Sequence, residues 1–282
     1  MRKNILFFGL FFVFFLSCKK EDSSPQRNES LSELKLSVMK LGFDTLDILV
    51  NGDTIIVEQD IVLFKSKLFK TIPRQAVVTP NSPTFGGYYL KSFKYFISNT
   101  LTNHNPVLEA IEEYRKILNT LPKNYYYPGT VITRVFNEND ADLIINAYSE
   151  FSNTCGFAEF PTYNYMVSTP KAELIVGSSI NINLNNWNLL SNTQRKYLIA
   201  HELGHAIGIR HTNWRSSIYE TEFFSENGYT YGAYTVPNTN NSSLNPDANS
   251  IFNGAQCGRS WGSGFTTNDR RAITYVSAGL AQ

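Results

Sequence analysis

The sequence is poor in the residues that most often hold metal ions and disulfides, and neither sign of charge is in excess. Its 282 residues include four histidines and three cysteines, and 25 Lys and Arg balance 24 Asp and Glu. This balance removes any bulk electrostatic case for a nucleic-acid partner. The apolar run at the N-terminus has twelve residues, 5–16, and is too short to cross a bilayer. No internal repeat is present, and the length suits one good-sized domain plus something smaller.

Three of the four histidines lie within eleven residues. Residues 201–211 read His-Glu-Leu-Gly-His-Ala-Ile-Gly-Ile-Arg-His, which fits the pattern H-E-x-x-H-x-x-G-x-x-H at every specified position. An α-helix advances about 100° per residue, so His201 and His205 stack on one helix face, one turn apart. Both imidazoles can then reach a single ion at about 2.0–2.1 Å.

The third histidine requires the helix to end. On a continued helix, His211 would lie roughly 9 Å beyond His205, too far to share the ion. The chain must therefore turn back between them, and Gly208 stands where the turn is needed, because glycine adopts a positive φ without steric cost. Before the motif, Ser191 and Gln194 have the spacing of a capping box, which predicts a helix, mostly buried, that contains the first two histidines.

Three neutral histidines and a water form an open tetrahedral zinc site, the catalytic kind. The ion lowers the pKa of its water towards about 7 and polarises a carbonyl group. Glu202 lies beside the first ligand and is predicted to accept the water's proton and deliver it to a leaving amine. The alternative is a zinc ion that only braces the fold, or histidines placed by accident. A bracing site would not need Glu202 and would usually have four protein ligands.

The N-terminus has the pattern of an export signal. A positive segment, 1–4, precedes the apolar run, and residues 15–18 read Phe-Leu-Ser-Cys, similar to a relaxed bacterial lipobox. We therefore predict a signal peptide over residues 1–17 and lipidation of Cys18, which would anchor the protein to the membrane only through the lipid. Residues 19–22, Lys-Lys-Glu-Asp, resemble the Lys-then-acidic signal of Bacteroidetes-type lipoproteins, which implies the outer face of the outer membrane. The alternative is an ordinary secretory signal, with Cys18 incidental.

The other two cysteines, Cys155 and Cys257, form an even number in an exported chain. A disulfide between them is predicted for an oxidising compartment, with two buried thiols as the competing interpretation.

The rest of the chain divides by composition. A polar tether, residues 18–30, leads to an N-terminal region, residues 31–78, which is interpreted as a pro-segment or a small packing subdomain. Its runs 54–57 and 61–64 are predicted strands, and a turn is predicted at Asn51 and Gly52, just before the first of them. It contains no cysteine, which excludes latency through a metal-bound cysteine of this region.

Residues 79–282 are predicted to form an α+β catalytic domain, beginning at a Pro- and Gly-containing boundary. Its apolar patterns predict a helix over 106–118, a last helix over 270–277, and strands over 90–97, 130–136, 141–148, 156–160 and 179–184.

The motif and its continuation, His211-Thr212-Asn213-Trp214, resemble the metzincin zinc peptidases, and most of all the bacterial dual-action HEIGH metallopeptidases. The resemblance implies a twisted mixed five-stranded sheet, a backing helix, the zinc helix and a C-terminal helix. It places residues Gly156, Phe157, Ala158 and Glu159 on the antiparallel edge strand that pairs with extended substrate. Within that strand, Phe157 and Glu159 are predicted to be structural.

The chain departs from the resemblance at one position. Metzincins place a methionine in a tight turn beneath the zinc, and Phe252 occupies the matching position here. An apolar phenylalanine can pack under the ligands, although its shape differs, and neighbours of the ligands orient them.

The sequence therefore predicts an exported zinc endopeptidase that acts on proteins or peptides. One alternative is a non-catalytic binding lipoprotein on the same scaffold, which the retained Glu202 and three histidines disfavour. Another is a zinc hydrolase for a different amide, such as cell-wall peptide. Ca²⁺ binding by the Asn- and Asp-rich loops has no support, since no loop has the required ligand spacing.

Overall fold

A computed structural model describes residues 30–41, 43, 45, 48–68, 88–123, 128–165, 172–212, 223–226, 229–232, 236, 247–254 and 257–278. The predicted signal peptide, Cys18 and nearly all of the tether lie outside these residues. Among the helices in the described part of the chain, none combines the length and apolar character needed to cross a membrane.

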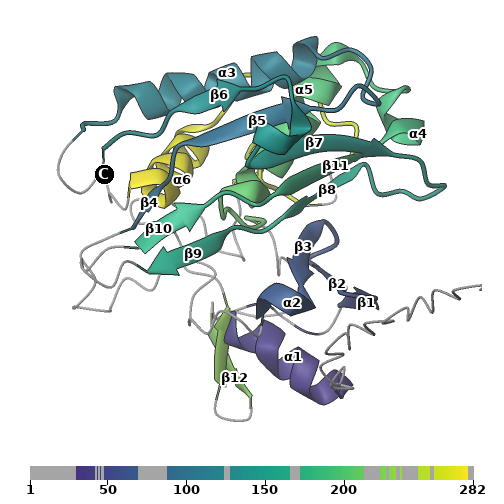
Figure 1. Cartoon of the computed structure of the whole chain (residues 1–282), viewed down its shortest axis with the longest axis vertical. Coiled ribbons are helices and arrows are strands. Elements are labelled where there is room, and N and C mark those ends of the chain that lie inside the picture. The colour runs from purple at the N-terminus through teal and green to yellow at the C-terminus, as the bar shows by residue number, and fades with distance from the viewer. Residues whose placement is uncertain are drawn as a thin grey trace, which may run out of the picture.

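The fold is built on an eight-stranded sheet with the order β1-β2-β3-β8-β11-β7-β5-β6 (Figure 1). Five of these strands come from the predicted catalytic domain: β5 Phe93–Ile97, β6 Ile132–Arg134, β7 Leu143–Tyr148, β8 Gly156–Glu159 and β11 Ser179–Asn183. Strands β11, β7, β5 and β6 are parallel neighbours, and β8 is antiparallel to β11. The predicted mixed five-stranded sheet is thereby confirmed as the main part of a larger one.

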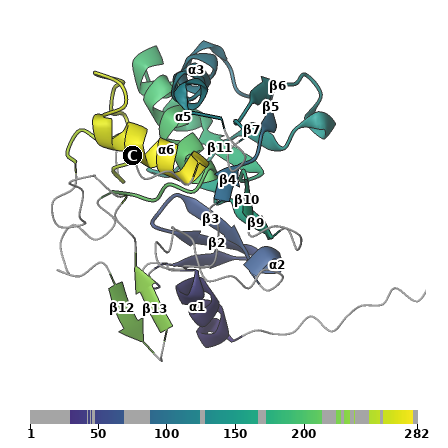
Figure 2. The ribbon, with the colours of Figure 1, turned by 90° about the vertical axis from the view of Figure 1, so that its left-hand side faces the viewer.

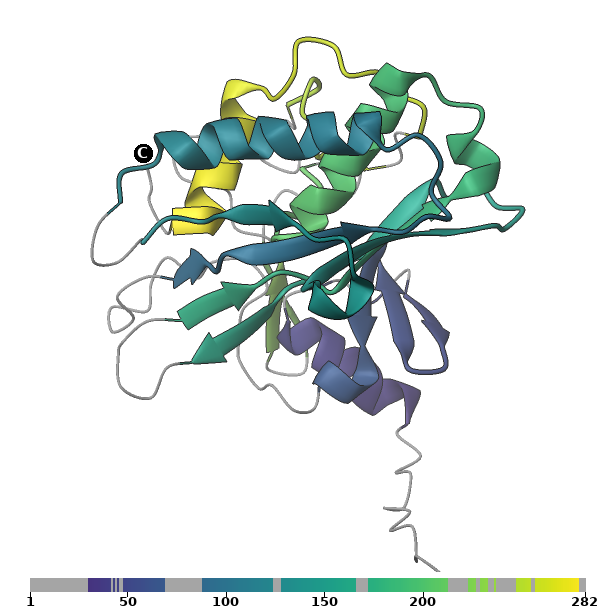
Figure 3. The same cartoon turned by 45° about the horizontal axis from the view of Figure 1, so that its top comes forward.

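Three long helices lie on one face of this sheet (Figure 3). They are α3 Asn105–Thr120, α5 Asn192–Ala206 and α6 Thr267–Ala278. Helix α3 packs against both α5 and α6, and the Tyr114 hydroxyl of α3 donates a 2.6 Å hydrogen bond to the Ala200 carbonyl of α5. The predicted backing helix, metal-site helix and C-terminal helix are therefore present. A one-turn helix, α4 Leu184–Trp187, connects β11 to α5 and buries Trp187.

The N-terminal region contributes the remaining three strands of the sheet. Its elements are α1 Leu31–Lys40, β1 Leu49–Asn51, β2 Thr54–Val57, β3 Ile61–Phe64 and α2 Lys65–Leu68. The two strands predicted at 54–57 and 61–64 are thus confirmed as β2 and β3. We call residues 30–68 the N-terminal unit. It has a small hydrophobic core of its own. Among the buried residues of that core, only Phe160 comes from the catalytic part, the name used here for residues 88–278.

One strand prediction was wrong, and two further strands were not predicted. Residues 90–97 were expected to form one strand, but the chain breaks at Lys91 and Ser92 into β4 Tyr88–Leu90 and β5. The break occurs because β4 belongs to a second sheet, where it pairs with β10 Ala172–Ile175, which in turn pairs with β9 Thr162–Tyr165. Neither β9 nor β10 was expected from the sequence.

Smaller elements complete the described chain. A 3₁₀ turn spans Glu138–Asp140. The hairpin of β12 Phe223–Glu226 and β13 Tyr229–Gly232 lies beside α1 rather than beside the main sheet, as Figure 2 shows.

Candidate metallopeptidase active site

Helix α5 positions the first two histidines. It begins with the predicted capping box, in which Ser191 accepts from the Gln194 backbone and the Gln194 side chain accepts from the Ser191 backbone. The helix ends at Ala206, and Gly208 follows with φ 102°, as the required turn predicts. The turn is closed by a 2.8 Å hydrogen bond from the Ile209 amide to the Gly204 carbonyl, and it brings His211 back to the helix.

The three histidines converge through their Nε2 atoms. His205 Nε2 lies 3.0 Å from His201 Nε2 and 3.1 Å from His211 Nε2, and the third separation is 3.2 Å. Four tetrahedral ligands at 2.0–2.1 Å from an ion are about 3.3 Å apart. The spacing of the three nitrogens is therefore close to that of three ligands of one metal ion.

The protonation of the rings supports the same conclusion. His201 Nδ1 lies 2.7 Å from the Ile251 carbonyl and His205 Nδ1 lies 2.6 Å from the Ile209 carbonyl. A carbonyl oxygen only accepts, so each Nδ1 carries a hydrogen, and in a neutral ring the Nε2 then has a lone pair. Burial lowers the pKa of His205 well below 6.5, which keeps that ring neutral. Lone pairs that face one another at 3 Å repel unless a cation lies between them, and the donor set suits such an ion.

A turn beneath the histidines holds them in place. Phe252, which the resemblance to metzincins predicts at the methionine position, is fully buried. Its ring packs so closely on Gly204 that a Cβ at Gly204 would overlap it. The neighbouring Gly254 leaves room for the His211 ring, since a Cβ there would lie 2.7 Å from His211 Nδ1. These two glycines are required by packing, which the sequence motif alone does not explain.

The same turn is tied to the start of α6 by Asp269, a residue that the sequence analysis did not identify as part of the site. Its carboxylate accepts hydrogen bonds from the Ser250 hydroxyl, the Ile251 amide and the Thr266 amide. Burial raises its pKa, and these hydrogen bonds act in the opposite direction. Because the Ile251 carbonyl orients His201, Asp269 supports the metal site indirectly.

Replacing Asp269 with alanine should therefore weaken both the fold and metal binding. The loss leaves buried donors without partners and should lower the free energy of unfolding by about 2–3 kcal/mol. Disturbing groups that orient metal ligands typically costs about 10- to 100-fold in metal affinity, and we expect the lower end of that range. Chelator competition and urea unfolding measure the two effects. The Asp269→Asn variant, which keeps one acceptor oxygen, should fall between the parent and the alanine variant, and an unchanged metal affinity in both would contradict this role.

Glu202 follows the first ligand on α5 and is almost completely buried. Its Oε2 atom has no hydrogen-bond partner among the described residues. Burial, reinforced by the charge of Asp60, raises its pKa well above 4.5. Gly156 of β8 permits this close packing, because a Cβ there would lie 3.1 Å from Glu202 Oε1.

A cavity of about 340 Å³ opens beside Glu202 and His201. Its walls come from the β2–β3 turn, the residues before β8, the ligand face of α5 and the disulfide. The lining residues are Gln59, Asp60, Asn153, Thr154, Cys155, Gly156, Tyr197, Leu198, His201, Glu202 and Cys257. The carboxylate and the ligand face of α5 thus border a space that can receive a side chain.

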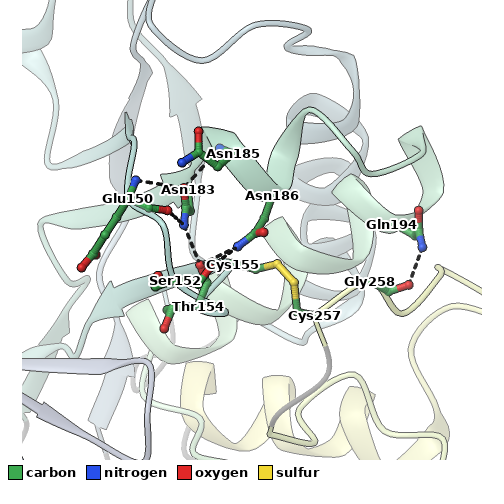
Figure 4. The surroundings of a disulfide bond; sticks show 10 residues. All are labelled: Glu150, Ser152, Thr154, Cys155, Asn183, Asn185, Asn186, Gln194, Cys257 and Gly258. Atoms are coloured by element: carbon green, nitrogen blue, oxygen red, sulfur yellow. Dashed lines mark hydrogen bonds between the residues drawn. A yellow bond between two sulfur atoms is a disulfide. The ribbon is translucent and has the colours of Figure 1, made fainter.

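Cys155 and Cys257 are joined in a disulfide at the wall of this cavity (Figure 4). The loop before Cys155 is also fixed by two amides from the β11–α4 junction. Asn183 donates to the carbonyls of Glu150 and Thr154, and Asn186 donates to those of Ser152 and Thr154. The cavity wall is therefore held by one covalent bond and several hydrogen bonds.

The expected substrate strand is β8, but it does not lie at an edge of the sheet. Strand β3 of the N-terminal unit pairs with it in parallel. On β8, Phe157 packs against Tyr148, while Glu159 is buried and accepts from the Ser178 backbone and from Lys67. Neither side chain lines the cavity.

Asp60, which was not predicted from the sequence, places a carboxylate beside the Nε2 atoms of the histidines. It lies in the β2–β3 turn, and its Oδ2 is 3.1 Å from His211 Nε2 and 3.4 Å from His201 Nε2. Its carboxylate and the three imidazoles offer ligand atoms that all lie within 4.8 Å of one another. The only available signal was a charged residue between two apolar strands, which most often marks a solvated turn.

The mixed sheet with its buried helix, the convergent imidazoles and the adjoining buried glutamate define a metal-dependent hydrolase. A family model described as dual-action HEIGH metallo-peptidase matches residues 127–277, just over half of the chain. The chain belongs to this family of metallopeptidases. The matched region contains the three histidines and Glu202 and begins after the N-terminal unit.

Two solved structures of myroilysin are also similar to the chain. The match to one of them covers 72% of this chain and 84% of the myroilysin chain, with 14% sequence identity and a TM-score of 0.37. The match to the other covers 71% of this chain and 88% of the myroilysin chain, with 14% sequence identity and a TM-score of 0.35. No curated protein sequence matches.

Proposed function

We propose that this metallopeptidase is an exported zinc endopeptidase that cleaves proteins or peptides, with His201, His205 and His211 as zinc ligands and Glu202 as general base and acid. The observation that carries the proposal is the convergence of three Nε2 atoms, at 3.0–3.2 Å, beside a buried glutamate that borders a cavity. Nitrogen ligands from three histidines, with one further position for water, are typical of catalytic zinc.

Zinc held by the three histidines would polarise the scissile carbonyl and lower the pKa of a water towards about 7. Glu202 borders the cavity and would accept one proton from the water whose oxygen attacks the carbonyl carbon. The same carboxyl group delivers that proton to the leaving nitrogen as the carbon–nitrogen bond breaks. The second proton of the water passes from the new carboxyl group to the amine, so the products are a carboxylate and an ammonium, and Glu202 returns to its starting ionisation state.

The substrate main chain is proposed to add to β8. This strand is antiparallel to β11, and the amides on its other side, which pair with β3 here, would pair with an extended peptide that takes the place of β3. The cavity lined by Tyr197, Leu198 and the disulfide lies next to Glu202 and would receive a side chain adjacent to the cleaved bond.

Export and lipid anchoring belong to the same proposal. The positive segment 1–4, the apolar run 5–16 and Cys18 support cleavage before Cys18 and attachment to the bacterial outer membrane, with surface exposure favoured by residues 19–22. The Cys155–Cys257 disulfide is in keeping with an oxidising compartment.

The test is reversible metal removal. The chain from Lys19 onward, and the same chain without residues 19–78, are assayed on casein before and after treatment with a chelator. The larger hydrophobic core of the protein is built from buried residues between Leu90 and Ala278, and none of them belongs to the N-terminal unit. The shorter form therefore keeps all of these residues. We expect about one zinc ion per chain, loss of hydrolysis on its removal and recovery with one equivalent of Zn²⁺. Hydrolysis that survives full metal removal, or zinc-loaded protein that cleaves no peptide in either form, would contradict the proposal.

A further inference from the structure

We propose that the N-terminal unit is an internal inhibitor, in which Asp60 is the fourth ligand of the metal and β3 occupies the place of the substrate strand. This inference rests on the proposed function, because it concerns the same metal and the same cleft. It assigns a role to a part of the chain that the family match does not reach.

The position of Asp60 is that of a ligand. Its Oδ2 lies 3.1 Å from His211 Nε2 and 3.4 Å from His201 Nε2, and its Oδ1 lies 3.5 Å from His205 Nε2. These separations are close to the roughly 3.3 Å between ligands of a tetrahedral zinc ion. The Oδ1 atom is buried and has no hydrogen-bond partner within the described part of the chain. A carboxylate at this point takes the position that the attacking water needs.

Strand β3 occupies the outer side of β8. The Ala158 amide donates to the Asp60 carbonyl and the Phe160 amide donates to the Val62 carbonyl, each over 2.9 Å. These are amides of β8 and of the residue that follows it, and they are available to a substrate only when β3 is absent. The same short segment therefore blocks both the metal and the main-chain binding surface. Figure 1 shows β3 directly beside β8, at the junction between the N-terminal unit and the rest of the sheet.

Side chains anchor the unit on both sides of Asp60. Glu58 forms a buried ion pair with Arg210, the neighbour of His211, with Arg210 Nε 2.7 Å from Glu58 Oε1. The guanidinium of Arg210 also lies 4.4 Å from the ring centroid of Phe43 in the N-terminal unit. On the other side, Lys67 pairs with Glu159 at the end of β8. Each pair joins the N-terminal unit to the catalytic part.

The turn that presents Asp60 is strained. Glu58 and Gln59 have φ values of 51° and 80°, which are unfavourable for residues with a side chain. Such conformations persist only where surrounding contacts determine them, and they cluster at clamps and switches. The anchors supply those contacts here. Release of this strain favours opening of the N-terminal unit.

The test compares the chain from Lys19 onward with its Asp60→Ala and Asp60→Asn variants, each loaded with Co²⁺. The matched control is Asp53→Ala, which removes an aspartate at the opposite end of β2 in the same unit. Visible absorption reports the ligands of the cobalt ion, and acetohydroxamate is the probe for an open coordination position. A unit that is closed for 90–99% of the time lowers apparent affinity by about 10- to 100-fold. We expect the Asp60→Ala variant to show a changed spectrum, hydroxamate binding tighter by that factor and casein hydrolysis faster by a similar factor, with the asparagine variant in between.

Identical spectra and hydroxamate affinities in all four proteins would overturn the inference. Thermal unfolding of each variant identifies one that has failed to fold, and the asparagine variant, which keeps the size of the side chain, then carries the comparison. If the spectrum and hydroxamate affinity change as expected but no variant cleaves casein, the inhibitor assignment stands and the proposed peptidase function fails. If the parent and the Asp60 variants cleave equally fast, the function stands and the inhibitor assignment fails.

Discussion

Replacing Glu202 with glutamine should nearly abolish peptide hydrolysis and leave the metal in place. Glutamine has almost the same shape, but it cannot accept a proton from water or deliver one to the leaving amine. Loss of general acid–base catalysis typically costs about 10²- to 10⁴-fold in rate. Glu202 is not one of the groups that converge on the metal, so the zinc content of the variant should equal that of the parent. Steady-state cleavage of a fluorogenic peptide, together with elemental analysis, measures both quantities.

The assay is made in the Asp60→Ala background as well as in the parent, so that inhibition by the N-terminal unit does not hide the effect. Glu113→Gln is the matched control. Glu113 lies on α3 and accepts a hydrogen bond from Lys196, which is on the same helix as Glu202, but it does not face the site. Its activity should be unchanged. A Glu202→Gln variant that keeps more than a tenth of the activity would exclude Glu202 as the proton-transfer group.

The stability of the same variant gives an independent control. In the folded, metal-free protein the pKa of Glu202 is raised, so its ionised form is disfavoured at any pH above the ordinary value of 4.5. The folded state then loses stability relative to the unfolded state as pH rises through that value. Glutamine removes this cost, and the metal-free variant should unfold at the same or a higher temperature than the parent at neutral pH. Lost activity with undiminished stability separates a chemical role from a folding defect.

The central part of the site could be predicted because it is local in the sequence. His201 and His205 need only the geometry of a helix, and Gly208 and His211 need only the requirement that the helix end. The structure has these elements as expected, including the capping box at Ser191 and the positive φ of Gly208.

The parts that could not be predicted are set by distant contacts. Asp60 is 141 residues from His201, and no local pattern links them. The role of Asp269 depends on how the start of α6 packs under the turn at Ile251, which is a tertiary contact. Gly204 and Gly254 could have been noticed as glycines close to the ligands, but only the packing of Phe252 and His211 against them shows why a side chain is excluded.

The fold shows the same division. The five central strands follow from apolar runs in the sequence. The order of the sheet depends on pairings between distant segments, so the extension by β3, β2 and β1 could not be derived from these runs. Predicting that a strand lies at the edge of a sheet means predicting that no other segment pairs with one of its sides. For β8 this prediction is wrong in the intact chain, because β3 pairs with it.

Removal of the disulfide should have the largest effect on stability. Cys155 and Cys257 are 102 residues apart, and the segment between them contains β8, β11, α5 and all three histidines. In the chain-entropy description, a cross-link that closes a loop of about 100 residues stabilises the folded state by about 4.7 kcal/mol. In a domain of this size, each kcal/mol shifts Tm by about 2–4 °C. We therefore expect the Cys155→Ser, Cys257→Ser double variant to unfold roughly 10–18 °C below the oxidised parent.

Calorimetry of the oxidised parent, the reduced parent and the double variant measures this effect. The reduced parent and the double variant should unfold at similar temperatures, since both lack the same constraint. Stability and site structure can also be separated. Asn183 and Asn186 still hold the loop before Cys155 by hydrogen bonds, so the folded double variant should keep its zinc affinity within a few fold at low temperature. An oxidised parent that unfolds at the same temperature as the double variant would show that the cross-link does not constrain the unfolded chain. Zinc binding that is lost while the fold remains would instead place the disulfide among the groups that shape the metal site.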